Sequence, residues 1–136
     1  IDIEAPNHTF GEGEVILLQR MKTGALFEFC CVAGAILAEA GAEHENRVRD
    51  YARDFGLVFQ ITDDLLDVMS TAEKTGKAVG KDAKQGKATL VSLLGIEAAR
   101  ARAEELATNV AQMVGSYGAS ANLLQMLPQY LLNRES

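Results

Sequence analysis

The sequence contains no tryptophan, only two prolines and few aromatic residues of any kind. Aromatic side chains make up 6% of the chain, whereas hydrophobic residues make up 48%. The apolar mass therefore comes from alanine, leucine and valine, which suits closely packed helices. Because the prolines stand at Pro6 and Pro128, neither interrupts the long middle of the chain. No stretch alternates like a strand for long, so we expect one all-α domain over residues 1–136.

Cysteine is also scarce, with Cys30 and Cys31 adjacent in an apolar helical run. Two thiols make no disulfide framework, and neighbouring residues on a helix point in different directions. We therefore expect no disulfide and a reducing, cytoplasmic compartment.

Positive charge is outweighed, since 13 lysines and arginines face 19 acidic residues and leave a net charge of −6. Nucleic-acid binding depends on neutralising phosphates, so we expect no nucleic-acid partner. The most apolar run, residues 24–38, is 15 residues long and includes Glu28, which makes it too short and too charged to span a membrane. An anionic ligand would need local lysines or metal ions to overcome the acidic field.

Helical periodicity divides the chain into segments. The predicted helices cover residues 14–42, 45–69, 88–116 and 120–133. Gly41 is suited to end the first, and after Phe55 the second becomes apolar on all sides, which predicts that it is buried. Residues 70–87 break the pattern, and Ser70 is a candidate cap for a short turn. We expect Pro128 to kink the last helix or to move its start.

The most informative residues are Asp63, Asp64 and Asp67 on the second predicted helix. Spacings of three and four residues place all of them on one helix face. Burying ionised carboxylates is costly unless cations meet them. Mg²⁺ fits this pattern, because it accepts one or two carboxylates and completes its shell with water and phosphate oxygens. The competing interpretation is a solvated acidic face, which the apolar neighbours Phe59 and Ile61 make less attractive.

Three further groups surround the aspartates. Gln60 precedes Asp63 by about one turn, and a buried amide there needs hydrogen-bond partners. Lys22 and Thr23 open the preceding apolar run, although a lysine at the edge of a buried helix ordinarily extends to water. A lysine- and glycine-rich segment follows Asp67, with five lysines that either keep a surface loop soluble or form a cationic lid over a phosphate ligand. Those lysines are Lys74, Lys77, Lys81, Lys84 and Lys87.

A nucleotide-hydrolysing P-loop is excluded. Residues 80–87 have five residues between their glycines, and Ala88 follows the lysine where serine or threonine is needed. No predicted strand precedes the segment either.

Taken together, these motifs resemble the class I polyprenyl diphosphate synthases, the trans-prenyltransferases, and in particular bacterial farnesyl diphosphate synthases. Residues 55–67 match the second aspartate-rich region of that family, and residues 22–26 resemble its Lys-Thr motif. Further similarity lies in residues 75–77, 80–82, 86–90, 94–97 and 130–134. The fold implied is part of the isoprenoid synthase class I helical bundle.

The resemblance implies a reaction in which isopentenyl diphosphate attacks the carbocation of an ionised allylic diphosphate. It implies that Asp63 binds Mg²⁺ directly and that Asp64 and Asp67 support it. The diphosphate-binding residues it implies are Lys22, Lys77 and Lys87. Thr23 and Gln60, with the Lys22 carbonyl, would face the cationic carbon, whereas Lys81 and Lys84 have weaker claims to a role.

The same resemblance shows departures. The family's first aspartate-rich motif, its isopentenyl-binding basic residues and its length-setting residues are not found in these 136 residues. We therefore expect the chain to be the C-terminal portion, with the N-terminal half absent, inactive alone and with exposed helix faces. A homodimer or a companion N-terminal fragment follows from the family. A longer-chain (geranylgeranyl) synthase and a non-catalytic helical partner of a prenyltransferase remain open. A terpene cyclase fits the triad less well.

Overall fold

The computed structural model describes residues 11–75 and 89–134. Within them all regular structure is helical, which confirms the predicted all-α class. The elements are α1 (Glu12–Gln19), η2 (Arg20–Gly24), α2 (Ala25–Leu37), α3 (Ala42–Thr75), α4 (Leu90–Leu94), α5 (Ile96–Met113), η3 (Gly115–Ala121) and α6 (Asn122–Asn133).

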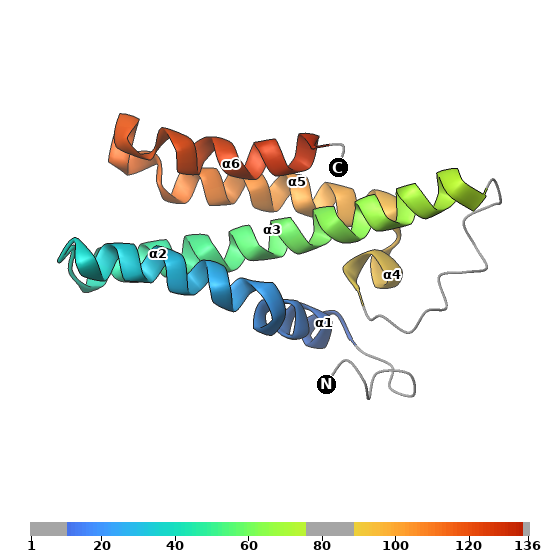
Figure 1. The fold of residues 1–136 in the computed structure, drawn as a ribbon, viewed down its shortest axis with the longest axis horizontal. Coiled ribbons are helices and arrows are strands. Elements are labelled where there is room, and N and C mark those ends of the chain that lie inside the picture. The colour runs from blue at the N-terminus through green and yellow to red at the C-terminus, as the bar shows by residue number, and fades with distance from the viewer. Residues whose placement is uncertain (1–10, 76–88, 135–136) are drawn as a thin grey trace.

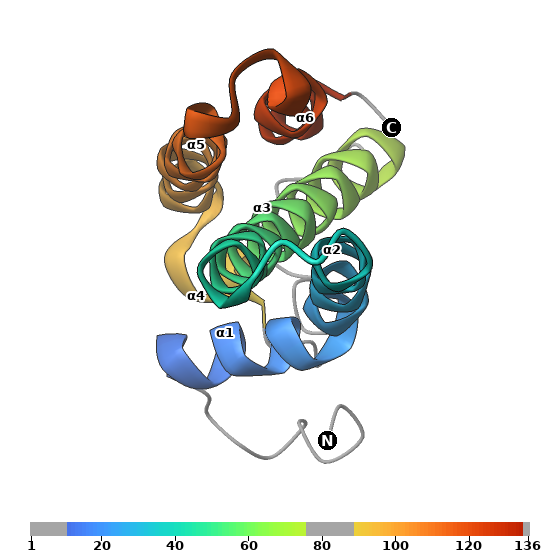
Figure 2. The ribbon, with the colours of Figure 1, turned by 90° about the vertical axis from the view of Figure 1, so that its left-hand side faces the viewer.

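Helix α3 is the axis of the arrangement. Figure 1 shows it running the length of the molecule, with α1 and α2 on one side and α5 and α6 on the other. Figure 2, turned by 90°, shows α1 below α3, α2 beside the near end of α3, and α5 and α6 above it. Helix α3 therefore contacts every layer, and a side chain on it reaches groups from distant parts of the sequence.

Helix α3 is longer than the sequence pattern predicted. It spans 34 residues, from Ala42 to Thr75, instead of residues 45–69. Its start follows Glu39 and Gly41, whose φ angles of 51° and 84° lie in the left-handed region that reverses the chain after α2. Ser70 lies inside the helix, so the predicted cap there is wrong. The residues after it tolerate helical backbone, and no glycine occurs until position 76.

The first predicted helix, residues 14–42, is interrupted. Residues 20–24 form the π-helical turn η2, and α2 ends at Leu37. The turn brings Gly24 against α3, because a Cβ atom added to Gly56 would lie 2.9 Å from the Gly24 Cα. Two glycines thus allow backbone contact between η2 and α3, and π-turns within helices often accompany functional sites.

The core lies where α3 meets α1, α4 and α5. Small alanines on α5, Ala99, Ala103 and Ala107, are buried and let that helix approach α3 closely. Tyr51 of α3 is buried, and its hydroxyl donates a hydrogen bond to the Leu124 carbonyl on α6 at 2.8 Å. The largest fully buried side chains are Tyr51, Ile61, Leu90, Val15, Val58, Val110, Val114 and Pro128.

The C-terminal region contains two breaks. Thr89 caps α4 through a reciprocal pair of hydrogen bonds with Ser92, and Gly95, with φ of 87°, separates α4 from α5. The single helix predicted over residues 88–116 is therefore two helices. Gly118, with φ of 60°, separates α5 from α6 as predicted. Pro128 lies buried within α6 and does not mark its start.

Both cysteines are free thiols, as predicted. Partial burial beside Cys30 raises the pKa of the Cys31 thiol, with desolvation as the larger cause. Across residues 11–75 and 89–134, no helix is both long enough and apolar enough to cross a membrane.

Candidate functional site

A chain of polar contacts joins η2 to the acidic face of α3. The Thr23 hydroxyl donates to the Gln60 Oε1 atom at 3.2 Å, and Gln60 Nε2 donates to Asp64 Oδ1 at 3.5 Å. Gln60 is buried, so its amide depends on these partners. Thr23 is 37 positions from Gln60 in sequence, and Gln60 is four from Asp64, yet these three predicted site residues occupy one place in the fold.

Asp63, beside this chain of contacts, is paired with Arg134. The Arg134 Nη2 atom lies 3.2 Å from Asp63 Oδ1. The guanidinium also lies over the Phe59 ring, with its Cζ atom 4.9 Å from the ring centroid. The aromatic ring, one turn before Asp63 on α3, thus positions the arginine on the carboxylate.

The carboxylates themselves are more open than the sequence suggested. Residues 55–62 are almost entirely buried, as predicted, but Asp63 and Asp64 are half-buried and Asp67 is exposed. Among the described residues, no group of three or more acidic, histidine or cysteine side chains converges to hold a metal ion. The triad is therefore an accessible acidic edge at the end of the buried stretch, and not a closed cage.

This donor set suits a hard cation bound from one side. Carboxylate oxygens are the ligands Mg²⁺ prefers, and that ion usually keeps several waters or phosphate oxygens. Exposure of Asp63 to 50% of its side-chain surface leaves room for such ligands. The residues present fit a shared Mg²⁺–phosphate site, and an all-protein metal cage would need further ligands.

The lysines of the prediction are not placed. Lys77, Lys87, Lys81 and Lys84 lie outside the described residues. Lys22 belongs to the η2 backbone, and its side chain is also outside the described part. The predicted diphosphate contacts remain predictions.

Aromatic contacts between α2 and α3 support the site. Phe27 packs edge-on against Phe55 and Phe59, with ring centroids 5.0 and 5.4 Å apart. One turn from Phe59, Gly56 makes the close approach to Gly24. These contacts fix the register of η2 on α3, which determines whether Thr23 reaches Gln60.

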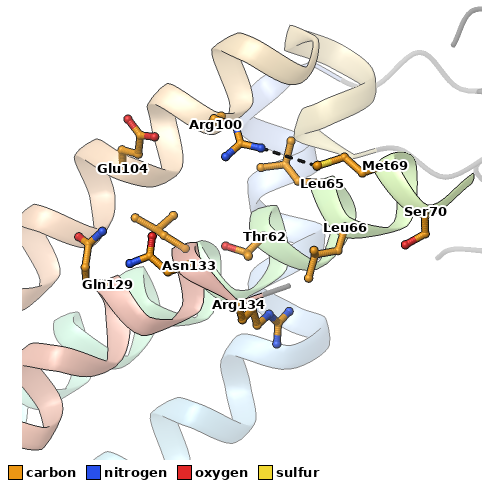
Figure 3. A pocket seen from close by; sticks show the side chains of 11 residues that line it. Thr62, Leu65, Leu66, Met69, Ser70, Arg100, Glu104, Gln129, Asn133 and Arg134 are labelled. Atoms are coloured by element: carbon orange, nitrogen blue, oxygen red, sulfur yellow. Dashed lines mark hydrogen bonds between the residues drawn. The ribbon is translucent and has the colours of Figure 1, made fainter. Parts of the chain in front are cut away.

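A pocket of about 600 Å³ adjoins the acidic face, between α3, α5 and α6. Figure 3 shows Arg134 at its edge, with Glu104, Gln129 and Asn133 along the α5 and α6 sides. On its far wall Arg100 Nη2 lies 3.6 Å from the Met69 sulfur.

Sequence reasoning gave Arg134 no role. It falls within residues 130–134, which share the family resemblance, but it lies 71 positions from Asp63 and belongs to no motif with it. Only the end of α6 brings the two together.

The sequence that contains these site residues is similar to that of known proteins. A family model described as polyprenyl synthetase matches residues 2–127. A dimethylallyltranstransferase of Fischerella ambigua is 45% identical over 113 residues, 83% of this chain and 33% of that protein. A farnesyl diphosphate synthase of Bacillus subtilis is 34% identical over 98% of this chain and 45% of its own length.

A solved structure agrees with the fold. The apo crystal structure of an FPP/GFPP synthase from Zymomonas mobilis superposes with a TM-score of 0.77 at 37% identity. The match covers 96% of this chain and 42% of that one. The chain thus spans between a third and a half of the length of these three proteins. Because the family model covers most of the chain, and the acidic face of α3 lies within it, the chain belongs to the polyprenyl synthetase family.

Proposed function

We propose that the complete protein is a prenyltransferase that condenses isopentenyl diphosphate with an allylic diphosphate, dimethylallyl or geranyl. The observation that carries this proposal is the contact chain from Thr23 through Gln60 to Asp64, beside the accessible carboxylate of Asp63. It assembles polar oxygens and acidic ligands where the buried apolar stretch of α3, residues 55–62, ends. Such an arrangement suits a substrate with a charged head and an apolar tail.

In this proposal Asp63, Asp64 and Asp67 hold Mg²⁺ on the open side of α3. When bound, the ion supplies charge stabilisation for the departing diphosphate. Lys22, Lys77 and Lys87 add positive charge around the same leaving group. The ion and the lysines act on the negative charge that develops on the diphosphate, which is where electrostatic catalysis has its largest effect.

Thr23 and Gln60 have a different role, because they carry no charge. Their oxygen atoms lie together in a partly buried position, joined by the 3.2 Å hydrogen bond. Oxygen dipoles stabilise a carbocation without attacking it as a strong nucleophile would. The hydrogen bond also fixes the amide orientation, since Gln60 Nε2 points to Asp64 and Oε1 to Thr23.

The product we propose is farnesyl diphosphate. The similarity to the Bacillus subtilis enzyme, which extends over 98% of this chain, supports a short product. The names of the relatives include other prenyl transfers, and a geranylgeranyl-type product is the competing assignment.

We further propose that residues 1–136 form the C-terminal portion of the enzyme and that the other aspartate motif lies in the remainder. Four large apolar side chains of α2 support this, since helices of the remainder would cover them. Their exposures are 64% for Leu26, 70% for Phe29, 55% for Ile36 and 85% for Leu37. By the same family reasoning the complete enzyme is a cytoplasmic homodimer, and this portion alone is inactive.

The test is a condensation assay with the complete protein and, separately, with the 136-residue chain. Each is mixed with isopentenyl diphosphate and an allylic diphosphate in the presence of Mg²⁺, and products are identified by mass. Formation of a chelator-sensitive prenyl product by the complete protein supports the proposal, and its carbon count distinguishes farnesyl from longer products. If the complete, folded protein makes no product, the role of a non-catalytic helical partner replaces it.

A further inference from the structure

Arg134 forms an ion pair with the carboxylate that is proposed to bind the metal directly. Its Nη2 atom lies 3.2 Å from Asp63 Oδ1, the residue proposed as the direct metal ligand. A guanidinium and a divalent cation cannot share one carboxylate oxygen without mutual repulsion.

The arginine is well placed but incompletely satisfied. Its side chain is 17% exposed and lies over Phe59. One hydrogen bond joins it to Asp63, while its Nε atom is buried without a hydrogen-bond partner. Leaving a buried donor unpaired costs free energy that offsets part of the ion pair. Arg134 is thus held at Asp63 by one ion pair and the Phe59 ring, with one buried donor left unpaired.

The pocket that Arg134 lines contains hydrogen-bond acceptors other than Asp63. Arg134 lines the pocket of about 600 Å³ whose other lining residues include Glu104, Gln129 and Asn133, as Figure 3 shows. A carboxylate and two side-chain amides there provide acceptors for the guanidinium donors. Arg134 directly follows the last residue of α6 and has extended backbone, with φ of −70° and ψ of 142°. Rotation of its side chain needs no unwinding of the helix.

We propose that Arg134 is a displaceable counter-ion of Asp63, which occupies the carboxylate when no metal is bound and moves into the pocket when a divalent cation binds. This inference rests on the proposed function, in which Asp63 is a metal ligand. Arg134 is then a positioning residue that acts through Asp63. It preserves the geometry of the acidic face at low metal concentration and weakens the intrinsic affinity for the ion.

The alternative is a fixed structural ion pair that ties the end of α6 to α3. Both roles predict some loss of stability when Arg134 is replaced, so stability does not separate them. Metal affinity responds directly to the counter-ion role, because removing a cation that competes for the Asp63 carboxylate strengthens metal binding there.

The experiment is a titration of the complete protein with Mn²⁺, without substrate, followed by electron paramagnetic resonance of the free ion. Arg134→Gln is compared with Arg102→Gln, which makes the same change of net charge at an arginine paired with Glu105 on α5. We expect Arg134→Gln to bind Mn²⁺ several-fold more tightly than the parent and Arg102→Gln to bind it equally. Arg134→Lys keeps the charge and should stay close to the parent.

Two further variants keep the outcomes distinct. Asp63→Asn should lose most Mn²⁺ affinity; an unchanged affinity overturns both the proposed metal site and this inference. If Asp63→Asn does weaken binding but Arg134→Gln binds no more tightly than Arg102→Gln, the site stands and the inference is wrong.

Should Arg134→Gln fail to fold, Glu104→Gln decides. It removes the carboxylate that receives the displaced guanidinium, and we expect it to weaken Mn²⁺ binding a few-fold relative to the neighbouring control Glu105→Gln. Equal affinities in these two variants overturn the inference.

Discussion

The two halves of helix α3, residues 42–58 and 59–75, differ in how their charged side chains are paired with opposite charges. In the first half, Glu28 of α2 accepts hydrogen bonds from Arg49 at 2.9 Å and from Arg53 at 3.0 Å. These contacts hold α2 and α3 together with one carboxylate between two guanidinium groups. In the second half, Asp63 has one guanidinium at 3.2 Å and keeps half of its side-chain surface exposed.

Packing is also closer around the first half of α3 than around the second. The first half carries Gly56 against Gly24 and the aromatic contacts of Phe27. The second half borders a pocket, and Asp67 is exposed. The first half is built for stability, where opposite charges meet and space is filled. The second half keeps acidic oxygens accessible, as expected where ligands must enter and leave.

The largest expected effect lies in the second half. Asp63→Ala in the complete protein should lower turnover by about two orders of magnitude or more, because a metal ligand contributes several kcal/mol to charge stabilisation. Thermal stability should change little, since the carboxylate is half exposed. Steady-state kinetics in Mg²⁺ test this, with Asp50→Ala, an exposed aspartate of the first half, as the control. Near-normal turnover in Asp63→Ala would show that the proposed metal site does not lie in this half of the helix.

The next effect lies in the first half. Gly56→Ala places a methyl group 2.9 Å from the Gly24 backbone and 3.4 Å from Phe27, and such overpacking typically costs about 1–3 kcal/mol. The free energy of unfolding from urea titration of the complete protein should fall by that amount.

The matched control is Gly34→Ala on α2, where nothing lies within 4 Å of the added atom. It should be neutral or stabilising by up to about 1 kcal/mol, because alanine favours the helix. Equal changes in the free energy of unfolding at both glycines would mean that the close approach of Gly24 does not limit the size of the side chain at position 56.

Thr23→Val tests the junction of the two halves. It keeps the side-chain shape but removes the donor to Gln60, so we expect about 1 kcal/mol of destabilisation. A fall in kcat should accompany it if the amide orientation matters to the reaction. Thr108→Val, at an exposed threonine whose hydroxyl bonds the Glu104 carbonyl within α5, is the comparison. A Thr23→Val enzyme with unchanged kcat would assign the contact to structure alone.

The smallest effect concerns Glu28. Hydrogen bonding to Arg53, then to Arg49, lowers the pKa of this carboxyl group. Because the folded state favours the ionised form, its stabilisation is present above the ordinary glutamate pKa of about 4.3 and is lost as pH falls below it.

Glu28→Gln should therefore cost roughly 0.2–1 kcal/mol at neutral pH, as partly exposed pairs do, and less in acid. Thermal melting at pH 7 and pH 3 measures the difference. If Glu28→Gln destabilises the protein more at pH 3 than at pH 7, the assignment of a lowered pKa to Glu28 is wrong.

Much of the local structure followed from the pattern of residues. The all-α class, the burial of residues 55–62 and the common face of the three aspartates depend on periodicity within one helix. The extent of α3 did not follow, because serine, threonine and glutamate near residue 70 permit either a helix or a turn. The break at residues 20–24 was also missed, since a π-helical turn leaves no simple spacing signal.

Sequence by itself determined the acidic face of α3, with Gln60 and Asp64 four positions apart and within reach of each other. Tertiary structure alone decided that Thr23 completes the Gln60 contact, that Glu28 joins two arginines and that Arg134 pairs with Asp63. The physical reason is that contacts within a helix are set by its constant rise and turn. Contacts between helices depend on packing register, and here that register is set by the approach of Gly24 to Gly56 and by the position in which α6 ends.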